Sequence, residues 1–265
     1  MSALATTNIL DKITIKKKEN LPRIINDYKE KYKEAIKSNG SFYQTLAGPG
    51  LSLIGEIKRA SPSKGLIREN FDHLELAKLY EDHVDVLSIL TEEDFFKGSL
   101  GHLYEINKVS KLPTLCKDFI IDSRQIDMAY RLGASCILLI ASILDKDRLN
   151  KYIDHATSLG MDSLVEVHTR EELEKVLETN AKIIGINNRN LKDFTIDLNT
   201  TISLRKLIPD DYLVVSESGI YTKEDVEFIT SQVKIDGILV GESFMKAPSI
   251  AAHAKELRDA SKKEN

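Results

Sequence analysis

Short apolar runs rich in β-branched residues recur along the whole chain at a regular spacing. There are eight of them, at residues 51–58, 86–90, 114–117, 136–140, 163–166, 183–187, 213–217 and 237–240. Successive runs end 21 to 32 residues apart, which leaves room for one helix and two loops in every interval. The pattern therefore predicts eight strands with a helix between neighbours.

Helical periodicity fills most of these intervals, for example at residues 74–80, 126–132 and 173–177. Strands that are apolar on both faces and alternate with helices are typical of parallel sheets covered by helices. We therefore predict an α/β protein in which residues 51–265 form a (β/α)8 TIM barrel. An open doubly wound sheet is the alternative that fits the same alternation.

The first 50 residues precede the first predicted strand, and we expect them to form an N-terminal helical extension. Residues 24–38 are rich in lysine and glutamate with spaced Ile, Tyr and Ala, which predicts a helix packed on the barrel. A mobile amphipathic arm is the alternative. No linker rich in Pro, Gly or Ser divides the remainder, so residues 1–265 are expected to form a single domain.

Composition narrows the classes of function. The 265 residues include 37 Lys and Arg against 41 Asp and Glu, a formal net charge of −4 with no long basic block. This balance argues against nucleic-acid and membrane partners, so an anionic ligand has to be attracted locally. The N-terminus lacks a signal-peptide pattern and no apolar run reaches about 18–20 residues, which predicts a cytoplasmic protein.

Cysteine and histidine spacing gives no sign of a metal site. The two cysteines form no CxxC pair, and the six histidines form no HxH or HExxH group. We therefore expect two reduced core thiols, no disulfide framework and no metal.

Five of the predicted strands end in a polar residue. In a barrel of this kind the active site lies at the carboxyl ends of the strands, so the last residues are the candidates. The polar ones are Lys58, Lys117, Glu166, Asn187 and Glu217. Glu56 lies two positions before Lys58, and residues i and i+2 of a strand share a face, so this carboxylate and ammonium should point the same way.

Lys117 and Glu166 both lie within apolar sequence. Burial disfavours charge, so we expect a lowered pKa for the Lys117 ammonium and a raised pKa for the Glu166 carboxyl group. Groups tuned in this way can transfer protons near neutrality. A desolvated lysine also suits Schiff-base chemistry, and that alternative stays open at this point.

Small-residue loops that follow two late strands predict a phosphate site. Ser218 and Gly219 follow the seventh run, and Gly241 and Glu242 follow the eighth. Glycine lets backbone N–H groups approach an oxyanion closely, and the last two loops of such barrels commonly hold phosphate. The Ser-Pro-Ser-Lys-Gly loop that begins at Ser61 is expected to close over the same ligand.

Nine ordered motifs together resemble the indole-3-glycerol-phosphate synthase family. They are EIK at 56–58, SPSKG at 61–65, SILTE at 88–92, FFKGS at 95–99, LCKDFIID at 115–122, VEVH at 165–168, IGINNRNL at 184–191, VSESG at 215–219 and LVGES at 239–243. The likeness runs from about residue 51 to 246, and an N-terminal helical extension is also a trait of the family.

The resemblance implies a step of tryptophan biosynthesis that needs no cofactor. In this step 1-(2-carboxyphenylamino)-1-deoxyribulose 5-phosphate closes to indole-3-glycerol phosphate with loss of carbon dioxide and water, which makes the enzyme a carboxy-lyase. By this analogy Lys117 is the general acid of ring closure, and Lys58, oriented by Glu56, pairs with the substrate carboxylate. Glu166 serves as the base of the dehydration.

The same resemblance implies the other substrate contacts. Asn187 and Glu217 would orient the ligand and the lysines, and Arg189 would lie at the carboxylate end. The phosphate would rest on Ser61, Ser218, Gly219, Gly241 and the Glu242 backbone, and the aromatic ring would lie against Phe96, Phe119 and Leu191. We expect a small anionic substrate, a monomer, and transient contact with enzymes of the same pathway.

Two other functions stay open at this stage. One is a sugar-phosphate aldolase or isomerase that uses Lys117 covalently. The other is a phosphate-ligand binding barrel without catalysis.

Overall fold

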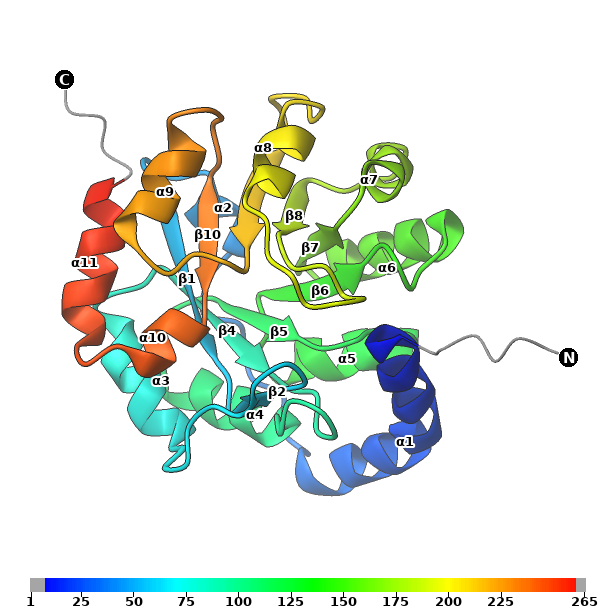
Figure 1. Cartoon of the computed structure of the whole chain (residues 1–265). Helices are drawn as coiled ribbons and strands as arrows, with labels where there is room; N and C mark the ends of the chain where they lie inside the picture. The colour runs from blue at the N-terminus through cyan, green and yellow to red at the C-terminus, as the bar shows by residue number, and fades with distance from the viewer. Residues whose placement is uncertain (1–7, 261–265) are drawn as a thin grey trace, which may run out of the picture.

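The computed structural model describes residues 8–260, and eight parallel strands form a closed barrel at its centre (Figure 1). In spatial order each strand pairs with its neighbour in sequence, and the last pairs with the first. This confirms the predicted barrel and excludes the open sheet. The strands are β1 (Ser52–Ile57), β4 (Val86–Leu90), β5 (Thr114–Lys117), β6 (Cys136–Ile140), β7 (Asp162–Val167), β8 (Ile183–Asn187), β9 (Leu213–Glu217) and β10 (Gly237–Val240).

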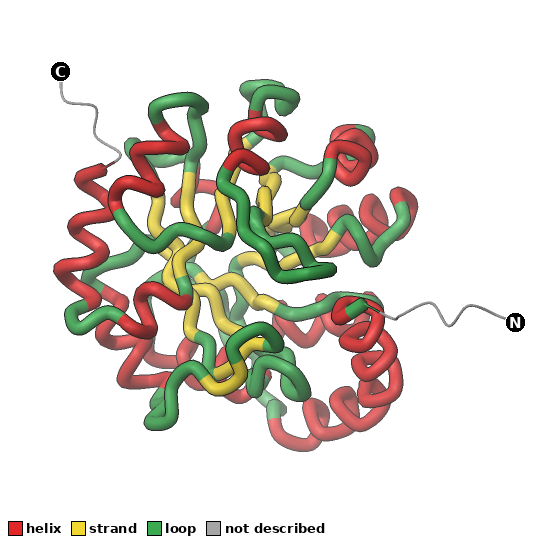
Figure 2. The backbone as a smooth tube through the Cα atoms, viewed as in Figure 1, coloured by secondary structure: helices red, strands yellow, loops and turns green. Residues whose placement is uncertain are grey.

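Helices surround the strands on the outside (Figure 2). Those that follow the barrel strands are α3 (His73–Glu81), α4 (Leu100–Val109), α5 (Ser123–Arg131), α6 (Lys146–Ser158), α7 (Arg170–Leu177), α8 (Asn199–Arg205), α9 (Lys223–Thr230), α10 (Glu242–Lys246) and α11 (Ile250–Ala260). A short antiparallel hairpin also follows β1 and consists of β2 (Ala60–Ser61) and β3 (Gly65–Leu66). Among the described residues, no helix is both long and apolar enough to span a membrane.

The barrel interior is apolar towards the amino-terminal ends of the strands. Ile54, Val86, Leu115 and Val215 are fully buried there, because alternate residues of each strand point inward. The short helix α2 (Phe42–Leu46) covers this end and inserts Phe42 into the same cluster.

The N-terminal helix begins and ends earlier than the sequence predicts. Helix α1 runs from Ile9 to Lys31 instead of over 24–38, and Asn8 caps it by accepting a hydrogen bond from the backbone N–H of Asp11 at 2.9 Å. The helix continues through Pro22, because its buried face packs on the barrel's outer core. The expectation for residues 1–7 lies outside the described residues, and the division into domains stays a prediction.

One buried ion pair fastens α1 to the barrel. The Nζ atom of Lys17 lies 2.6 Å from Oδ1 of Asp118, and the two side chains are only 3% and 9% exposed. Asp118 directly follows the last residue of β5, and its other oxygen accepts a hydrogen bond from Thr91 at 2.9 Å. The helix is therefore tied to the end of the barrel at which β5 terminates.

Candidate active site

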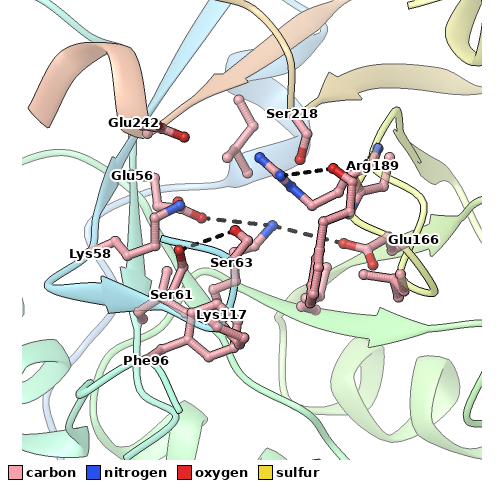
Figure 3. A pocket seen from close by; sticks show the side chains of 18 of the residues that line it. Glu56, Lys58, Ser61, Ser63, Phe96, Lys117, Glu166, Arg189, Ser218 and Glu242 are labelled. Atoms are coloured by element: carbon pink, nitrogen blue, oxygen red, sulfur yellow. Dashed lines mark hydrogen bonds and ion pairs between the residues drawn. The ribbon is translucent and has the colours of Figure 1, made fainter. Parts of the chain in front are cut away.

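A cavity at the carboxyl-terminal ends of the strands gathers nearly all the residues predicted from the sequence (Figure 3). Fourteen of the fifteen candidates line it: Glu56, Lys58, Ser61, Phe96, Lys117, Phe119, Glu166, Asn187, Arg189, Leu191, Ser218, Gly219, Gly241 and Glu242. The exception is Glu217, which is buried and makes an ion pair with Lys117. Because these residues come from seven of the eight barrel strands and the loops that follow them, only the closed barrel brings them together.

Lys117 lies at the centre of the charged groups. Its Nζ atom is 2.5 Å from Oε2 of Glu217, 3.9 Å from Oε2 of Glu166 and 4.0 Å from Oε2 of Glu56. Figure 3 shows Glu56 and Glu166 on opposite sides of the lysine. Glu56 also pairs with Lys58, so the expected contact between these two neighbours on one strand face is present.

These carboxylates reverse the expected pKa shift of the lysine. Burial alone would favour the neutral amine, but the charges of Glu217, Glu166 and Glu56 outweigh it and raise the pKa of Lys117 above its ordinary value. The expectation of a lowered pKa is wrong, because it considered the apolar sequence neighbours and not the carboxylates of other strands. Lys117 is therefore an ammonium ion at neutral pH.

The two glutamates nearest to Lys117 differ in their proton affinity. Burial opposes the charge of Glu166, but the hydrogen bond and charge of His168, together with Lys117, lower the pKa of Glu166 to about 2. The expected raised pKa of Glu166 is therefore wrong. Burial instead raises the pKa of Glu217 to about 7, since Lys117 only partly offsets the burial and Glu166 repels a second negative charge.

Two glycines make space for the buried carboxylates. A Cβ atom at Gly185 on β8 would occupy the position of Oε1 of Glu217, and one at Gly241 would collide with the carboxylate of Glu56. The missing side chains therefore allow these acids to lie inside the barrel next to Lys117.

Loops after β1, β9 and β10 form one side of the cavity. Ser61 and Ser63 in the β2–β3 hairpin have their hydroxyl oxygens 3.4 Å apart. The Nζ atom of Lys64 in this hairpin lies 4.0 Å from Oε1 of Glu242, so the hairpin reaches across to the loop after β10. Ser218 and Gly219 both have positive φ angles, 65° and 84°. These loops surround the position at which the sequence predicts phosphate.

Apolar side chains form another wall. The rings of Phe96 and Phe119 lie 5.9 Å apart at an interplanar angle of 35°, and Leu191 also lines the cavity. Arg189 also lines the cavity, where its Nη1 atom donates a hydrogen bond of 3.4 Å to the carbonyl oxygen of Phe194 and its guanidinium lies beside Ser218 (Figure 3). The cavity therefore combines a flat apolar surface, cationic groups and a small-residue loop region, which suits an aromatic ligand with two anionic ends.

Comparison with known proteins identifies the family. The sequence profile described as indole-3-glycerol phosphate synthase matches residues 8–257. The chain belongs to the indole-3-glycerol phosphate synthase family. The indole-3-glycerol phosphate synthase of Thermoanaerobacter pseudethanolicus is 46% identical over 248 residues, which cover 90% of this chain and 92% of the relative. The synthase of Acetivibrio thermocellus is 45% identical over 258 residues, with 94% and 99% covered.

Solved structures at lower identity share the fold of this indole-3-glycerol phosphate synthase family member. A 3-hexulose-6-phosphate synthase aligns with a TM-score of 0.65 at 18% identity, covering 80% of this chain and all of that one (100%). N-(5'-phosphoribosyl)anthranilate isomerase from Pyrococcus furiosus aligns with a TM-score of 0.58 at 17% identity, covering 80% and 98%. These likenesses support the barrel fold.

Sequence reasoning missed two features of the indole-3-glycerol phosphate synthase site, one in the cavity wall and one directly behind it. Ile9, Leu10 and Ile13 of α1 line it, although the predicted helix began only at residue 24. Nε2 of His168 lies 3.3 Å from Oε1 of Glu166, a contact that the VEVH motif alone did not predict. The period of two that relates Glu56 to Lys58 also relates Glu166 to His168, and this signal could have revealed the contact.

Proposed function

We propose that the protein is a carboxy-lyase that converts 1-(2-carboxyphenylamino)-1-deoxyribulose 5-phosphate to indole-3-glycerol phosphate, carbon dioxide and water. The observation that carries this proposal is the Lys117 ammonium, which is held among three buried carboxylates in the cavity. A proton donor fixed in this way is suited to protonate a carbonyl oxygen as a carbon nucleophile attacks the carbonyl carbon. Membership of the synthase family supports the choice of substrate.

The substrate would span the cavity between its two anionic ends. Its phosphate would accept hydrogen bonds from Ser61, Ser218 and the backbone of Gly219, Gly241 and Glu242, and its carboxylate would pair with Lys58 and Arg189. The anthranilate ring would lie against the Phe96 and Phe119 rings and Leu191. This apolar wall excludes water and so strengthens the lysine contacts.

The reaction would proceed in three steps. First, the ring carbon that bears the carboxylate attacks the ribulose carbonyl carbon, and Lys117 gives a proton to the oxygen. Loss of carbon dioxide then returns its bonding electrons to the ring and restores aromaticity. Finally, Glu166 takes a proton from the CH2 carbon between the nitrogen and the former carbonyl carbon, and the electrons of that C–H bond form the carbon–carbon double bond of the indole. A lysine protonates the departing hydroxyl group so that it leaves as water, while the nitrogen keeps its hydrogen. Asn187 and Glu217 orient the ligand and Lys117.

The charge of Lys117 couples the first step to the last. While Lys117 is charged, it contributes to the low pKa of Glu166 and so weakens that carboxylate as a base. When Lys117 has donated its proton, this stabilisation of the ionised carboxylate is lost and the proton affinity of Glu166 rises. Glu166 thus becomes a stronger base at the stage of the reaction that needs one.

The same electrostatics oppose the covalent-lysine alternative. A Schiff base needs a neutral amine, whereas the surrounding carboxylates keep Lys117 protonated. Borohydride trapping with candidate sugar phosphates separates the two functions. The synthase mechanism gives no adduct at Lys117, and a reduced adduct there would favour the aldolase.

Turnover of the ribulotide tests the proposed reaction directly. The chain contains no tryptophan, so the fluorescence of an indole product is measured against little protein background. We expect product to form without added metal or cofactor. An absence of product at high enzyme concentration, with ligand still bound, would instead support the non-catalytic binding barrel. Cytoplasmic location, a monomeric state and contacts with pathway enzymes stay predictions.

A further inference from the structure

The two oxygens of Glu166 face different partners. Oε2 is 3.9 Å from Nζ of Lys117, towards the cavity, whereas Oε1 is 3.3 Å from Nε2 of His168. His168 lies just beyond β7 and its side chain is 10% exposed. It does not line the cavity that holds Lys117 but a neighbouring polar one. The histidine therefore contacts Glu166 from behind and leaves the other oxygen to the site.

A second carboxylate holds the histidine on its far side. Oε2 of Glu172, in the first turn of α7, lies 3.2 Å from Nδ1 of His168 and accepts a hydrogen bond from the His168 backbone N–H at 2.7 Å. Both ring nitrogens thus face carboxylate oxygens. An imidazole with an acceptor on each side is most stable with both nitrogens protonated.

The charged groups around Glu166 and His168 determine whether the imidazole is protonated. Glu166 faces Lys117 from β5, Glu217 from β9 and Glu56 from β1. Burial opposes the charge of His168, but the two carboxylates of Glu166 and Glu172 beside its ring raise its pKa to about 10. The imidazolium therefore persists at neutral pH.

Glu217 is a useful comparison for the pKa of Glu166, because among the described residues no histidine lies beside it. Both carboxylates are deeply buried and both face Lys117, and Glu217 makes the closer contact with that lysine. Only Glu166 also has an imidazolium beside it. Yet the pKa of Glu217 is raised to about 7 and the pKa of Glu166 is lowered to about 2. His168 is the largest cause that lowers the pKa of Glu166, and a hydrogen bond from Asn187 adds to its effect.

We propose that His168 is a positioning residue whose imidazolium, held by Glu172, keeps Glu166 ionised and directs its Oε2 atom towards the cavity. The consequence for catalysis rests on the proposed function, in which Glu166 acts as a base. His168 itself touches neither the cavity nor the reacting atoms.

Nuclear magnetic resonance of the wild-type protein without substrate tests the first half of the proposal. The ¹⁵N shifts of His168 should show both ring nitrogens protonated up to about pH 9, and the ¹³C carboxyl signal of Glu166 should not titrate between pH 4 and 9. A His168 ring that becomes neutral near pH 6.5 would overturn the proposal. This measurement needs no turnover, so its result is independent of whether the proposed reaction is correct.

The variant His168→Gln tests the second half. In the same experiment the Glu166 carboxyl should titrate at higher pH, moving towards the pKa of Glu217 at about 7. In kinetics, kcat/KM at pH 6 relative to pH 8 should fall by up to about tenfold compared with wild type, since a base with a pKa of about 7 is roughly ten times less ionised at pH 6 than at pH 8. His168→Arg, which restores a cation, should recover part of this loss.

His155→Gln serves as the matched control, because His155 also pairs with a carboxylate, Asp127 at 2.8 Å, but lies on the surface. Its pH profile should equal that of wild type. A His168→Gln variant that loses activity by the same factor at every pH, with unchanged titration of Glu166, would show that His168 is only structural and would overturn the proposal. If the His168→Gln variant does not fold, Glu172→Gln provides the second test. The pKa of the His168 ring should be lower in Glu172→Gln than in wild type, and an unchanged pKa would overturn the proposal.

Discussion

The two ends of the barrel interior are formed by the same strands and yet differ in almost every property. On β1 the inward residue Ile54 lies in the apolar half and Glu56 in the charged half, and β7 repeats this step from Leu164 to Glu166. Helix α2 covers the apolar end, whereas the other end opens into the cavity. One change of residue type, two positions along a strand, thus separates the packed end from the reactive one.

The two ends serve different purposes: the apolar end stabilises the fold, and the charged end holds the reactive groups. Apolar burial at the covered end stabilises the fold by roughly 1.5–3 kcal/mol for each large side chain. Buried charges at the open end carry a desolvation cost and contribute little net stability. They are retained where each acid contacts a cation, as Glu56 contacts Lys58 and Glu217 contacts Lys117. Substitutions at the two ends should therefore affect different observables.

Replacing Lys117 by alanine should have the largest effect, and on activity. We expect kcat to fall by about 10²–10⁴-fold, because a positioned general acid contributes about that much, while ligand binding persists. Steady-state kinetics and product titration measure the two quantities. Lys146→Ala is the control, since Lys146 pairs with Glu178 on the surface and should leave kcat unchanged. Full activity in Lys117→Ala would refute the role of this lysine.

Phe42→Ala should lower the stability of the protein by disrupting packing at the covered, apolar end of the barrel. Removing this fully buried ring should lower the free energy of unfolding by about 3–5 kcal/mol. Because Phe42 is remote from the charged groups, kcat/KM of the folded fraction should change little. Denaturant unfolding gives the stability, and Phe228→Ala, at a half-exposed position on α9, should cost far less. A large loss of kcat with unchanged stability would contradict the separation of the two ends.

Lys17→Met tests whether a buried charge near the open end stabilises the fold instead of serving the reaction. Loss of its ammonium would leave Asp118 buried with no cation, which typically costs about 3–5 kcal/mol of unfolding free energy. Since Asp118 follows Lys117 directly, kcat should also fall. Lys16→Met is the adjacent control, because Lys16 makes only an exposed pair with Glu19 and should lose less than about 1 kcal/mol. Equal stability of the two variants would show that the buried pair does not fasten α1.

The pH dependence of stability should show the smallest effect. The pKa of Glu217 is raised from 4.5 to about 7 by folding, so between these values only the folded state keeps the proton. The resulting stabilisation is complete below pH 4.5 and is lost as the pH rises through 7. Relative to Glu217→Gln, wild type should lose up to about 3 kcal/mol of unfolding free energy between pH 5 and 8. A flat difference between wild type and Glu217→Gln over this pH range would refute the raised pKa.

The strands were predictable because their signal is local. The run 183–187 agrees with β8 and 213–217 with β9, since a buried parallel strand is a continuous apolar segment bounded by polar or glycine residues. The first predicted strand ended at Lys58, and β1 ends at Ile57. The polar strand ends then indicated the cavity, because barrel geometry brings them together.

The helix boundary and the pKa shifts depend on tertiary contacts. Pro22 reads as a helix breaker, yet α1 passes through it because Leu10, Leu21 and Ile25 are buried on one face. The pKa of Lys117 is governed by Glu217, 100 positions away in the chain, and not by its apolar neighbours in sequence. Local sequence could therefore locate the charged groups but could not assign their proton affinities.

The pairing of the first strand with the last sets the order in which the protein becomes functional during its synthesis. Ser52 of β1 pairs with Gly237 of β10, and Gly241 just beyond it lies against Glu56. While the ribosome is still making the segment before residue 237, β1 has an unpaired edge and Glu56 has no neighbour on that side. The wall of the cavity is thus completed by the last barrel strand to emerge, and catalytic activity in a nascent chain reports that the barrel has closed.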